Sequence, residues 1–320
     1  MKKINVWFNH WFSTAYHIIN MIKEDTKIEF SVVGTNQNIE SVVKVVCDHW
    51  EKEPAQLNGN EYIDYCLEFC KKHSIDVFVP RKNQLLIVKN IEKFDKINVK
   101  VLAERDLNKL KILNNKRSTY ELFKKLDMNC VPDYSLATDN SSFLDGCQRL
   151  REKYNKICFK FVEDEGAASF RIIEENRNKF DFFDGEKEFP EVIIMPYLDG
   201  KEVSIDCLKT KNGLIMVPRE KTDTRTEIIK YDVSLLEICK EFFEKCPIEH
   251  PCNIQFKYFE GKPYLLEINT RMSGGIQYSC IASQVNIPNI AINQLLNIDK
   301  NWIIDKSEKK ISYIEMPVLM

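Results

Sequence analysis

The sequence is poor in glycine and has no long apolar run. Only 10 of its 320 residues are glycine, which excludes a chain built largely of flexible linker or low-complexity sequence. No stretch approaches the roughly 18 apolar residues that a membrane-spanning helix needs, so we expect no membrane partner. The formal net charge is only -2, which argues against a general nucleic-acid binder. With 44% hydrophobic and 29% charged residues, the composition is that of an ordinary soluble globular protein, long enough for a multi-domain enzyme.

The cysteines also lack an organised pattern. There are eleven, an odd number, and no paired C-x-x-C spacing is present. We interpret them as reduced, buried residues of a cytoplasmic protein. The N-terminal segment MKKINVWFNHWF supports this location, because Asn5, Asn9 and His10 interrupt its apolar run and no signal-peptide cleavage site follows. Two groups contain both cysteine and histidine: Cys66, Cys70 and His73, and Cys246, His250 and Cys252. Without paired spacing, we interpret both groups as incidental rather than zinc-binding.

The first hundred residues alternate predicted strands with predicted helices. Strands are expected at 4–8, 28–35, 75–80 and 99–104, and helices at 14–24, 61–74 and 85–94. This alternation predicts parallel crossovers and a small doubly wound sheet. The turn after the first strand lacks G-x-G-x-x-G, which makes a Rossmann oxidoreductase the least favoured enzyme class.

The remainder is richer in hairpins. Helices are expected at 106–115, 116–128, 234–246 and 287–297, and strands within 156–173, 191–200, 201–210, 214–218 and 310–318. The segment KNG at 211–213 predicts a hairpin turn. The charged segment VPREKTDTRTEI is interpreted either as a solvated loop or as a substrate loop. The fold class is therefore α/β, becoming α+β in the C-terminal part.

The stretch CNIQFKYFEGKPYLLEINTRMSGG, residues 252–275, carries the most chemistry. Alternation along a strand places Glu267 and Asn269 on one face, and both offer hard oxygen ligands suited to Mg²⁺. Gln255 lies opposite Glu267 if the hairpin loop has three residues, 260–262, whereas a two-residue loop would place it on the other face. The alternative is an edge hairpin whose polar face lies in water. Arg271, followed by serine and two glycines, suits a bound anion.

Four segments in order resemble the ATP-grasp superfamily: NKRSTYELFKKL, ICFKF…GAASFR, IIMPYLDGKEVSID and NIQF…LLEINTRMSGG. The nearest likeness is to its carbamoyl-phosphate-synthetase-like and amino-acid-ligase branches, and it covers about residues 105–280. The resemblance implies a Rossmann-like pre-ATP-grasp domain at 1–105, followed by a two-lobed ATP-grasp fold. Its small lobe with the leading helices would span 106–195, and its large lobe with the metal and substrate site 196–320.

The resemblance also implies roles for individual residues. In the ATP site, the phosphates would be bound by Lys116, Lys160 and Gly166. The adenine linker would consist of Met195, Tyr197 and Leu198, and the ribose would be bound by the carboxylate of Glu202. Three ligands would hold Mg²⁺ (or Mn²⁺), with Glu267 bridging two ions: Gln255, Glu267 and Asn269. The catalytic cations would be Arg271, Lys160 and Arg219, and Lys221 would lie beside Arg219 in the substrate and phosphate loop. Taken alone, either phosphate lysine could instead be a surface residue.

The implied reaction is ATP-dependent ligation. A small carboxylate would be activated as an acyl-phosphate and joined to an amine or another nucleophile. A bicarbonate-phosphorylating, carbamoyl-phosphate-synthetase-like activity is the alternative that Gln255 favours. A non-catalytic nucleotide-binding protein is a third, because the loop around Gly166 is poor in glycine. The partners are then small-molecule substrates, with no nucleic acid, and a homodimer stays an open alternative.

Overall fold

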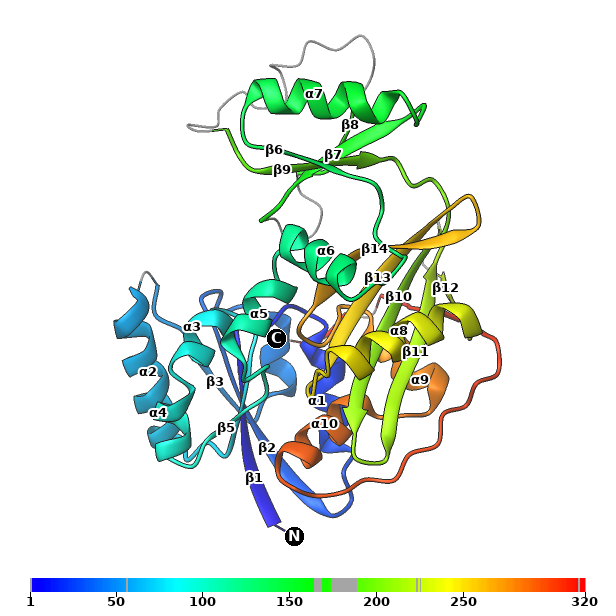
Figure 1. The fold of residues 1–320 in the computed structure, drawn as a ribbon. Coiled ribbons are helices and arrows are strands. Elements are labelled where there is room, and N and C mark those ends of the chain that lie inside the picture. Colours follow the sequence, from blue (N-terminus) through cyan, green and yellow to red (C-terminus); the bar gives the residue numbers. More distant parts are fainter. Residues whose placement is uncertain are drawn as a thin grey trace. The chain divides into compact units, whose positions relative to one another are not determined.

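The structure is a computed structural model that describes residues 2–55, 57–163, 169–173, 189–222, 224, 226–315 and 317–319 (Figure 1). By packing, the chain forms two compact units. Unit 1 comprises Met1–Lys111, Val203–Ile254 and Asn269–Met320, and unit 2 comprises Ile112–Glu202 and Gln255–Ile268. The three consecutive domains expected from the sequence stay a prediction. Among the described ranges, no helix has the length and apolar character that crossing a bilayer requires.

The first hundred residues of unit 1 form the doubly wound parallel sheet that their alternation predicts. Its strands lie in the order β3-β2-β1-β4-β5, and β1 pairs in parallel with both β2 and β4. Their bounds are β1 Lys2–Asn9, β2 Ile28–Asn36, β3 His49–Lys52, β4 Val77–Pro80 and β5 Lys100–Val101. The helices are α1 Ala15–Lys23, α2 Gly59–Lys72, α3 Gln84–Lys89 and α4 Ile91–Lys96, with a 3₁₀ turn η1 at Val42–Val46.

Both faces of this sheet are buried, which explains its continuous apolar runs. Alternation along β1 sends Val6 and Phe8 into one core and Trp7 into another. The Trp7 ring stacks on Phe78 with centroids 4.0 Å apart. One prediction was wrong here: the helix expected at 85–94 is two short helices, because Asn90 leaves the helical conformation (φ -113°, ψ 19°) between α3 and α4.

A six-stranded sheet has the order β14-β13-β10-β11-β12-β15. Its strands are β10 Glu202–Thr210, β11 Gly213–Lys221, β12 Thr226–Ile229, β13 Cys252–Phe259, β14 Lys262–Asn269 and β15 Lys309–Ser312. The helices of this region are α5 Leu107–Leu113, α8 Val233–Lys245, α9 Ile276–Ser283 and α10 Ile287–Leu295. The boundary between the units falls within β13 and β14. The solvated-loop interpretation of VPREKTDTRTEI was wrong for 226–228, because these residues belong to β12, which pairs with both β11 and β15.

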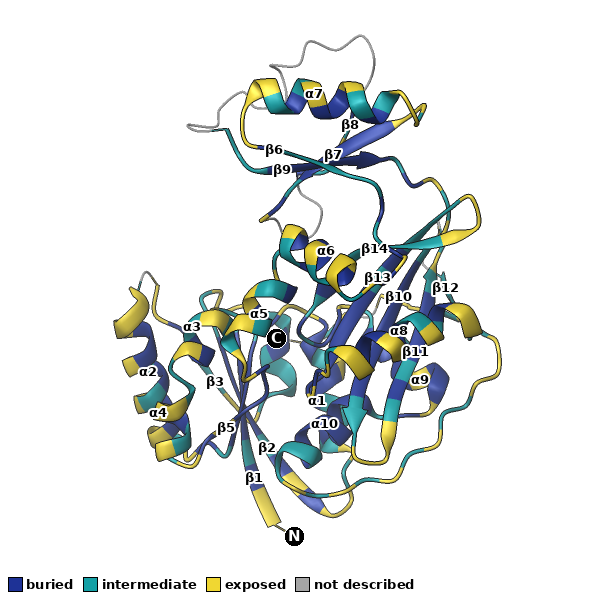
Figure 2. Ribbon diagram, in the orientation of Figure 1, coloured by how far each residue is buried: buried dark blue, intermediate teal, exposed yellow. Residues whose placement is uncertain are grey.

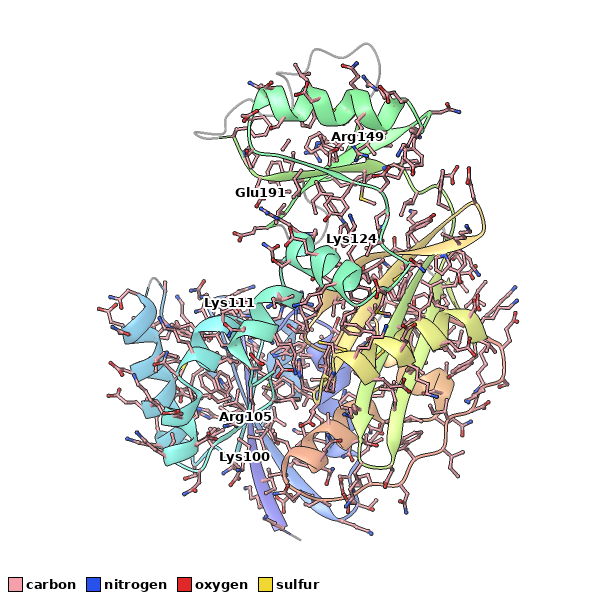
Figure 3. The ribbon with its side chains drawn as sticks, viewed as in Figure 1. Lys100, Arg105, Lys111, Lys124, Arg149 and Glu191 are labelled. Atoms are coloured by element: carbon pink, nitrogen blue, oxygen red, sulfur yellow. The ribbon has the colours of Figure 1, made fainter. Side chains whose placement is uncertain are left out.

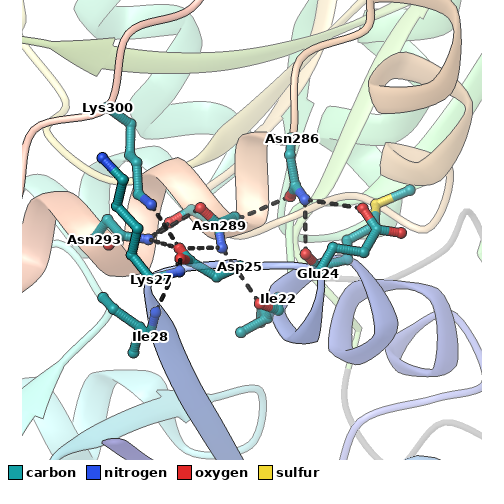
Figure 4. Close-up of polar contacts among 10 residues, drawn as sticks. Ile22, Glu24, Asp25, Lys27, Ile28, Asn286, Asn289, Asn293 and Lys300 are labelled. Carbon is teal, nitrogen blue, oxygen red and sulfur yellow. Dashed lines mark hydrogen bonds and ion pairs between the residues drawn. The ribbon is translucent and has the colours of Figure 1, made fainter. Parts of the chain in front are cut away.

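A buried carboxylate ties the end of α1 to α10 within unit 1 (Figure 4). The Asp25 side chain is fully buried and accepts hydrogen bonds from Asn289, Asn293 and Lys300, at 3.0, 3.1 and 2.7 Å. Burial would raise the pKa of Asp25, but the bonds from Lys300 and from the Lys27 backbone outweigh it and lower the pKa. This network of hydrogen bonds therefore holds the end of α1 against α10.

Unit 2 contains a four-stranded antiparallel sheet in the order β6-β9-β7-β8. Its elements are α6 Lys116–Lys125, β6 Ser135–Ala137, α7 Asn140–Arg151, β7 Ile157–Phe161, β8 Arg171–Ile173 and β9 Val192–Pro196. The buried face of α7, dark blue in Figure 2, packs Phe143 and Leu150 against Phe159 of β7. Arg149, labelled in Figure 3, donates to Asp133 and to the Tyr134 carbonyl and so fixes α7 to the chain before β6.

Candidate active site

Lys160 of β7 contacts polar groups from two other segments of unit 2. Its side chain is only 9% exposed on β7. Its Nζ donates to the Leu266 carbonyl at 3.1 Å and to the Tyr120 hydroxyl at 3.3 Å. The Tyr120 hydroxyl donates to the same carbonyl at 3.2 Å. Burial and then the negative charge of Glu267 raise the pKa of Tyr120. The cation of β7 therefore contacts a tyrosine whose pKa is also raised by the charge of the β14 carboxylate.

Lys116 is the first residue of α6, and it is buried. Asn115 caps the helix by accepting from the Ser118 backbone at 2.9 Å, which fixes where α6 begins. Lys116 and Tyr120 are four residues apart, so they share one face of the helix. Both lysines expected to approach the nucleotide phosphates thus belong to unit 2. Lys116 shares helix α6 with Tyr120, and Lys160 contacts Tyr120 from β7. Gly166, the expected phosphate-loop glycine, lies outside the described residues.

The predicted adenine linker begins within β9, at Met195, and continues beyond it. Met195 and Leu198 are buried, whereas Tyr197 is half-exposed. The Tyr197 backbone N–H donates to the Lys156 carbonyl at 2.9 Å, and the Lys156 ammonium lies 4.1 Å from the centre of the Tyr197 ring. Pairing of the backbone with an adenine edge would thus fall to groups other than the Tyr197 N–H. Glu202, the expected ribose carboxylate, is the half-exposed first residue of β10.

The hairpin between β13 and β14 differs from the prediction. Its loop has two residues, Glu260 and Gly261, and Lys262 already belongs to β14, so the expected three-residue loop was wrong. Both loop residues have positive φ, 49° and 79°, which are the signs of a type I′ turn. Such a turn matches the twist of the strands. Gln255 and Glu267 are both half-exposed.

Asn269 and Arg271 belong to unit 1 and contact each other. Arg271 Nη1 donates to Asn269 Oδ1 at 3.2 Å, and both side chains are half-exposed. The residue between them, Thr270, is buried and its carbonyl accepts from His250 Nε2 at 3.2 Å. Burial lowers the pKa of His250 to about 4, so the ring is neutral at pH 7. The expected metal ligand and the expected phosphoryl arginine therefore share one short, anchored segment.

Arg219 is enclosed by carboxylates. Its side chain is 3% exposed and forms ion pairs with Asp206, at 3.0 Å, and with Glu227. Burial alone would lower the pKa of Arg219, but the two carboxylates outweigh it and raise the pKa. This surrounding favours a positioning role for Arg219 over the direct contact with substrate expected from the sequence. Lys221, by contrast, is exposed at the end of β11.

The guanidinium of Arg219 supports the loop that follows Arg271. Arg219 Nη2 donates to Ser273 Oγ at 3.2 Å. A Cβ atom placed on Gly275 would lie 2.3 Å from Arg219 Nη1, so only glycine fits there without a shift. Asp206 in turn accepts from Asn253 at 2.9 Å and from Ser279 at 2.6 Å. Sequence reasoning missed Asp206, and the one available signal was a carboxylate in the middle of a strand, between Ile205 and Cys207.

Residues 188–316 match a family model described as ATP-grasp in the biosynthetic pathway with Ter operon. Among curated proteins, the uncharacterized protein MJ0776 of Methanocaldococcus jannaschii is 23% identical over 189 residues, covering 58% of this chain and 47% of that protein. The chain thus spans about half the length of the curated relative that it matches.

Solved structures of similar fold cover nearly all of the chain. The biotin carboxylase domain of Hydrogenobacter thermophilus 2-oxoglutarate carboxylase, in complex with MgADP, ADP and bicarbonate, has a TM-score of 0.71 at 14% identity, covering 93% of this chain and 70% of that one. The ADP complex of Staphylococcus aureus N5-carboxyaminoimidazole synthetase has a TM-score of 0.75 at 14% identity, covering 98% of this chain and 83% of that one. The Thermotoga maritima N5-carboxyaminoimidazole ribonucleotide synthetase has a TM-score of 0.66 at 18% identity, covering 94% of this chain and 77% of that one.

At these identities the structural likeness establishes the fold, and the family model identifies the same superfamily independently from the sequence. Both agree with the order of the four motifs and with the parallel and antiparallel sheets described above. The resemblance expected from the sequence is confirmed: the chain has the ATP-grasp fold, and its residues 188–316 match an ATP-grasp family model.

Proposed function

We propose that the protein is an ATP-dependent ligase that activates a small carboxylate as an acyl-phosphate and joins it to an amine or another nucleophile. The observation that carries this proposal is the buried Lys160, held beside Tyr120 at the strand that carries Glu267. A desolvated ammonium close to a carboxylate suits a polyphosphate that arrives with a divalent cation. The relatives crystallised with ADP or MgADP support the same nucleotide class.

The donor set fits magnesium. Gln255, Glu267 and Asn269 offer amide and carboxylate oxygens, the hard ligands that Mg²⁺ prefers, and all three side chains are half-exposed. Asn269 Oδ1 accepts from Arg271 and would have to exchange this bond for the cation. When bound, Mg²⁺ would neutralise phosphate charge on the nucleotide.

Two observations support Gln255 and Glu267 on one face despite the two-residue turn. The buried residues of β14, Leu265 and Ile268, are three apart, whereas strict alternation gives an even spacing. At the same point the Leu265 N–H donates to the Cys130 carbonyl, and the Leu266 carbonyl accepts from side chains. We infer from these contacts an extra residue in β14, a β-bulge, which would offset the missing loop residue.

In the first step, a carboxylate oxygen of the substrate would bond to the γ-phosphorus of ATP as the β–γ bridging bond breaks, which releases ADP. In the second, the lone pair of the amine would attack the acyl carbon, phosphate would leave, and the amine would lose a proton. Lys116 and Lys160 would hold the phosphate charge, and Arg271 would stabilise the phosphoryl group during transfer. This chain would need to exclude water from the acyl-phosphate, which hydrolyses otherwise.

Release of ADP and phosphate from MgATP tests the proposal across amino acids, other carboxylates and bicarbonate. We expect one carboxylate with its amine to stimulate turnover, and Glu267→Gln to reduce that rate at least a hundredfold. Glu260→Gln is the matched control, because Glu260 is an exposed carboxylate at the turn of the same hairpin. Nucleotide binding without turnover across the whole panel would favour the non-catalytic alternative.

Bicarbonate is the second candidate for the activated acid. The biotin carboxylase domain of similar fold was crystallised with bicarbonate, and an amide at position 255 suits the same interpretation. Stimulation of ADP release by bicarbonate alone, without any organic acid, would distinguish it from the first candidate.

A further inference from the structure

His49, Glu51 and His73 bring two imidazole nitrogens and a carboxylate oxygen together on unit 1. The three ligand atoms lie within 4.8 Å of one another. His49 Nε2 is 2.7 Å from Glu51 Oε1, and His73 Nε2 is 2.8 Å from the same oxygen. We propose that these side chains form a binding site for a zinc-like divalent transition-metal ion, separate from the residues proposed to hold magnesium.

The site is built on two regular elements. His49 and Glu51 are alternate residues of the edge strand β3, so their side chains lie on one face. His73 is the residue that ends α2, and its backbone N–H donates to the Phe69 carbonyl at 3.0 Å. Asn5 of β1 donates from its side chain to the carbonyls of His73 and Ser74 at 3.4 and 2.9 Å. All three ligands therefore start from restrained backbone.

The His73 ring has a nitrogen with an unmet bonding requirement. Its Nε2 is buried and makes no hydrogen bond within the described part of the chain, although it lies close to Glu51. The ring packs 4.4 Å from the Phe69 ring and 4.8 Å from the His49 ring, centroid to centroid. A bound cation would satisfy this nitrogen and separate the crowded side chains.

The ligand types select the metal. Two imidazoles and one carboxylate suit zinc, whereas magnesium and calcium take oxygen ligands. Tetrahedral zinc at about 2.0–2.1 Å from each ligand places ligand atoms roughly 3.3 Å apart. The separations of 2.7 and 2.8 Å from Glu51 would need to widen by about 0.5 Å, and the two imidazole nitrogens, which lie within 4.8 Å of each other, would have to reach the same spacing by side-chain rotation. Three protein ligands leave a fourth position for water or an anion.

Lys72 occupies part of this site and would compete with the metal. Its Nζ lies 2.7 and 3.0 Å from the two oxygens of Glu51. The Lys72 side chain is 61% exposed, so it can withdraw into solvent when a cation binds. Removing this ammonium should therefore leave metal binding as tight as before or tighter. Such a gain distinguishes metal binding from a purely structural ion-pair cluster.

The test is a Zn²⁺ titration by calorimetry of the full chain, freed of any affinity tag and treated with chelator. We expect one tight ion per chain, and a Kd at least tenfold higher for His49→Ala and for Glu51→Gln. His49 is exposed, so its removal should leave the fold intact, which circular dichroism checks. Lys72→Met should bind at least as tightly as the parent. His17→Ala is the matched control, because His17 is an exposed histidine on α1.

Co²⁺ gives a second readout, since the visible bands of a tetrahedral site are intense and should be lost in His49→Ala. Equal affinity of His49→Ala and His17→Ala for Zn²⁺ would overturn the proposal. Binding that persists in His49→Ala but disappears in Glu267→Gln would also overturn it, by assigning the ion to the residues proposed for magnesium. Neither result would bear on turnover by the ligase itself.

Discussion

Gly275 offers the sharpest test of how the loop after Arg271 is held. An added Cβ would lie 2.3, 2.6 and 2.8 Å from Nη1, Cζ and Nη2 of Arg219, whereas carbon contacts are ordinarily about 3.5–4.0 Å. The guanidinium would have to move by more than roughly 1 Å. It cannot do so cheaply, because Asp206, Glu227 and Ser273 all hold it in a site that is 3% exposed. We therefore expect Gly275→Ala to destabilise unit 1.

The magnitude follows from the bonds that such a shift disturbs. Breaking a buried ion pair costs about 3–5 kcal/mol, and overpacking alone costs about 1–3 kcal/mol. A partial shift of Arg219 should thus cost about 2–5 kcal/mol. Gly274→Ala is the matched control, because its nearest atoms, on Phe12 and Thr14, would be 3.9 Å away. That variant should lie within about 1 kcal/mol of the parent.

Urea unfolding followed by tryptophan fluorescence measures this effect selectively. The four tryptophans, Trp7, Trp11, Trp50 and Trp302, all lie in unit 1. Arg219→Lys added to Gly275→Ala should cost less than the sum of the single changes, since lysine keeps the charge without the guanidinium nitrogens that clash. Equal stability of the two alanine variants, or strict additivity in the double variant, would refute the reasoning.

Three further predictions concern other residues. Lys160→Met should reduce MgATP turnover by about 10²–10³ while the melting temperature stays the same or rises, because it removes a buried charge; a normal rate in the ADP-release assay would contradict this. Burial lowers the pKa of His250 to about 4 from an unfolded value near 6.5. Its contribution to the free energy of unfolding is therefore complete above about pH 6.5 and falls by roughly 3 kcal/mol as the pH drops to about 4. His250→Gln should flatten the dependence of unfolding free energy on pH between 6.5 and 4, and an unchanged slope would argue against it. Gly200→Ala should destabilise unit 2 by about 1–3 kcal/mol, because its Cβ would lie 2.5 Å from the Tyr258 carbonyl oxygen, and unchanged resistance to limited proteolysis would argue otherwise.

The parallel sheet could be predicted because its strands carry a strong local signal. Segments such as 77–80 are apolar without interruption, as expected for strands buried on both faces. By contrast, the helix at 140–151 was not predicted, because it has serine near its start and Gly146 inside it. It is stabilised by the Asp139 capping box and by tertiary packing. The helix at 276–283 is buried almost all round, so no polar face marks its period.

The candidate site was predictable by residue type but not by environment. Lys160 and Arg219 look alike in the sequence as cations that directly follow apolar residues. The structure surrounds Arg219 with two carboxylates and gives Lys160 a tyrosine and a backbone carbonyl. The partners of Lys160 lie far away in sequence, 40 residues for Tyr120 and 106 for Leu266, and Ser273, which also contacts Arg219, is 54 residues from it. No local pattern reports contacts over such distances.

The most direct test of the central claim follows labelled oxygen. The carboxylate that stimulates turnover, or bicarbonate if it does so alone, would be supplied with ¹⁸O and MgATP, and the released phosphate analysed by mass spectrometry. Transfer of γ-phosphate to the acid and its displacement by the nucleophile leave one ¹⁸O atom in the phosphate. We predict this transfer, and its loss in Glu267→Gln together with turnover. Unlabelled phosphate, or AMP and pyrophosphate in place of ADP, would contradict activation of a carboxylate as an acyl-phosphate.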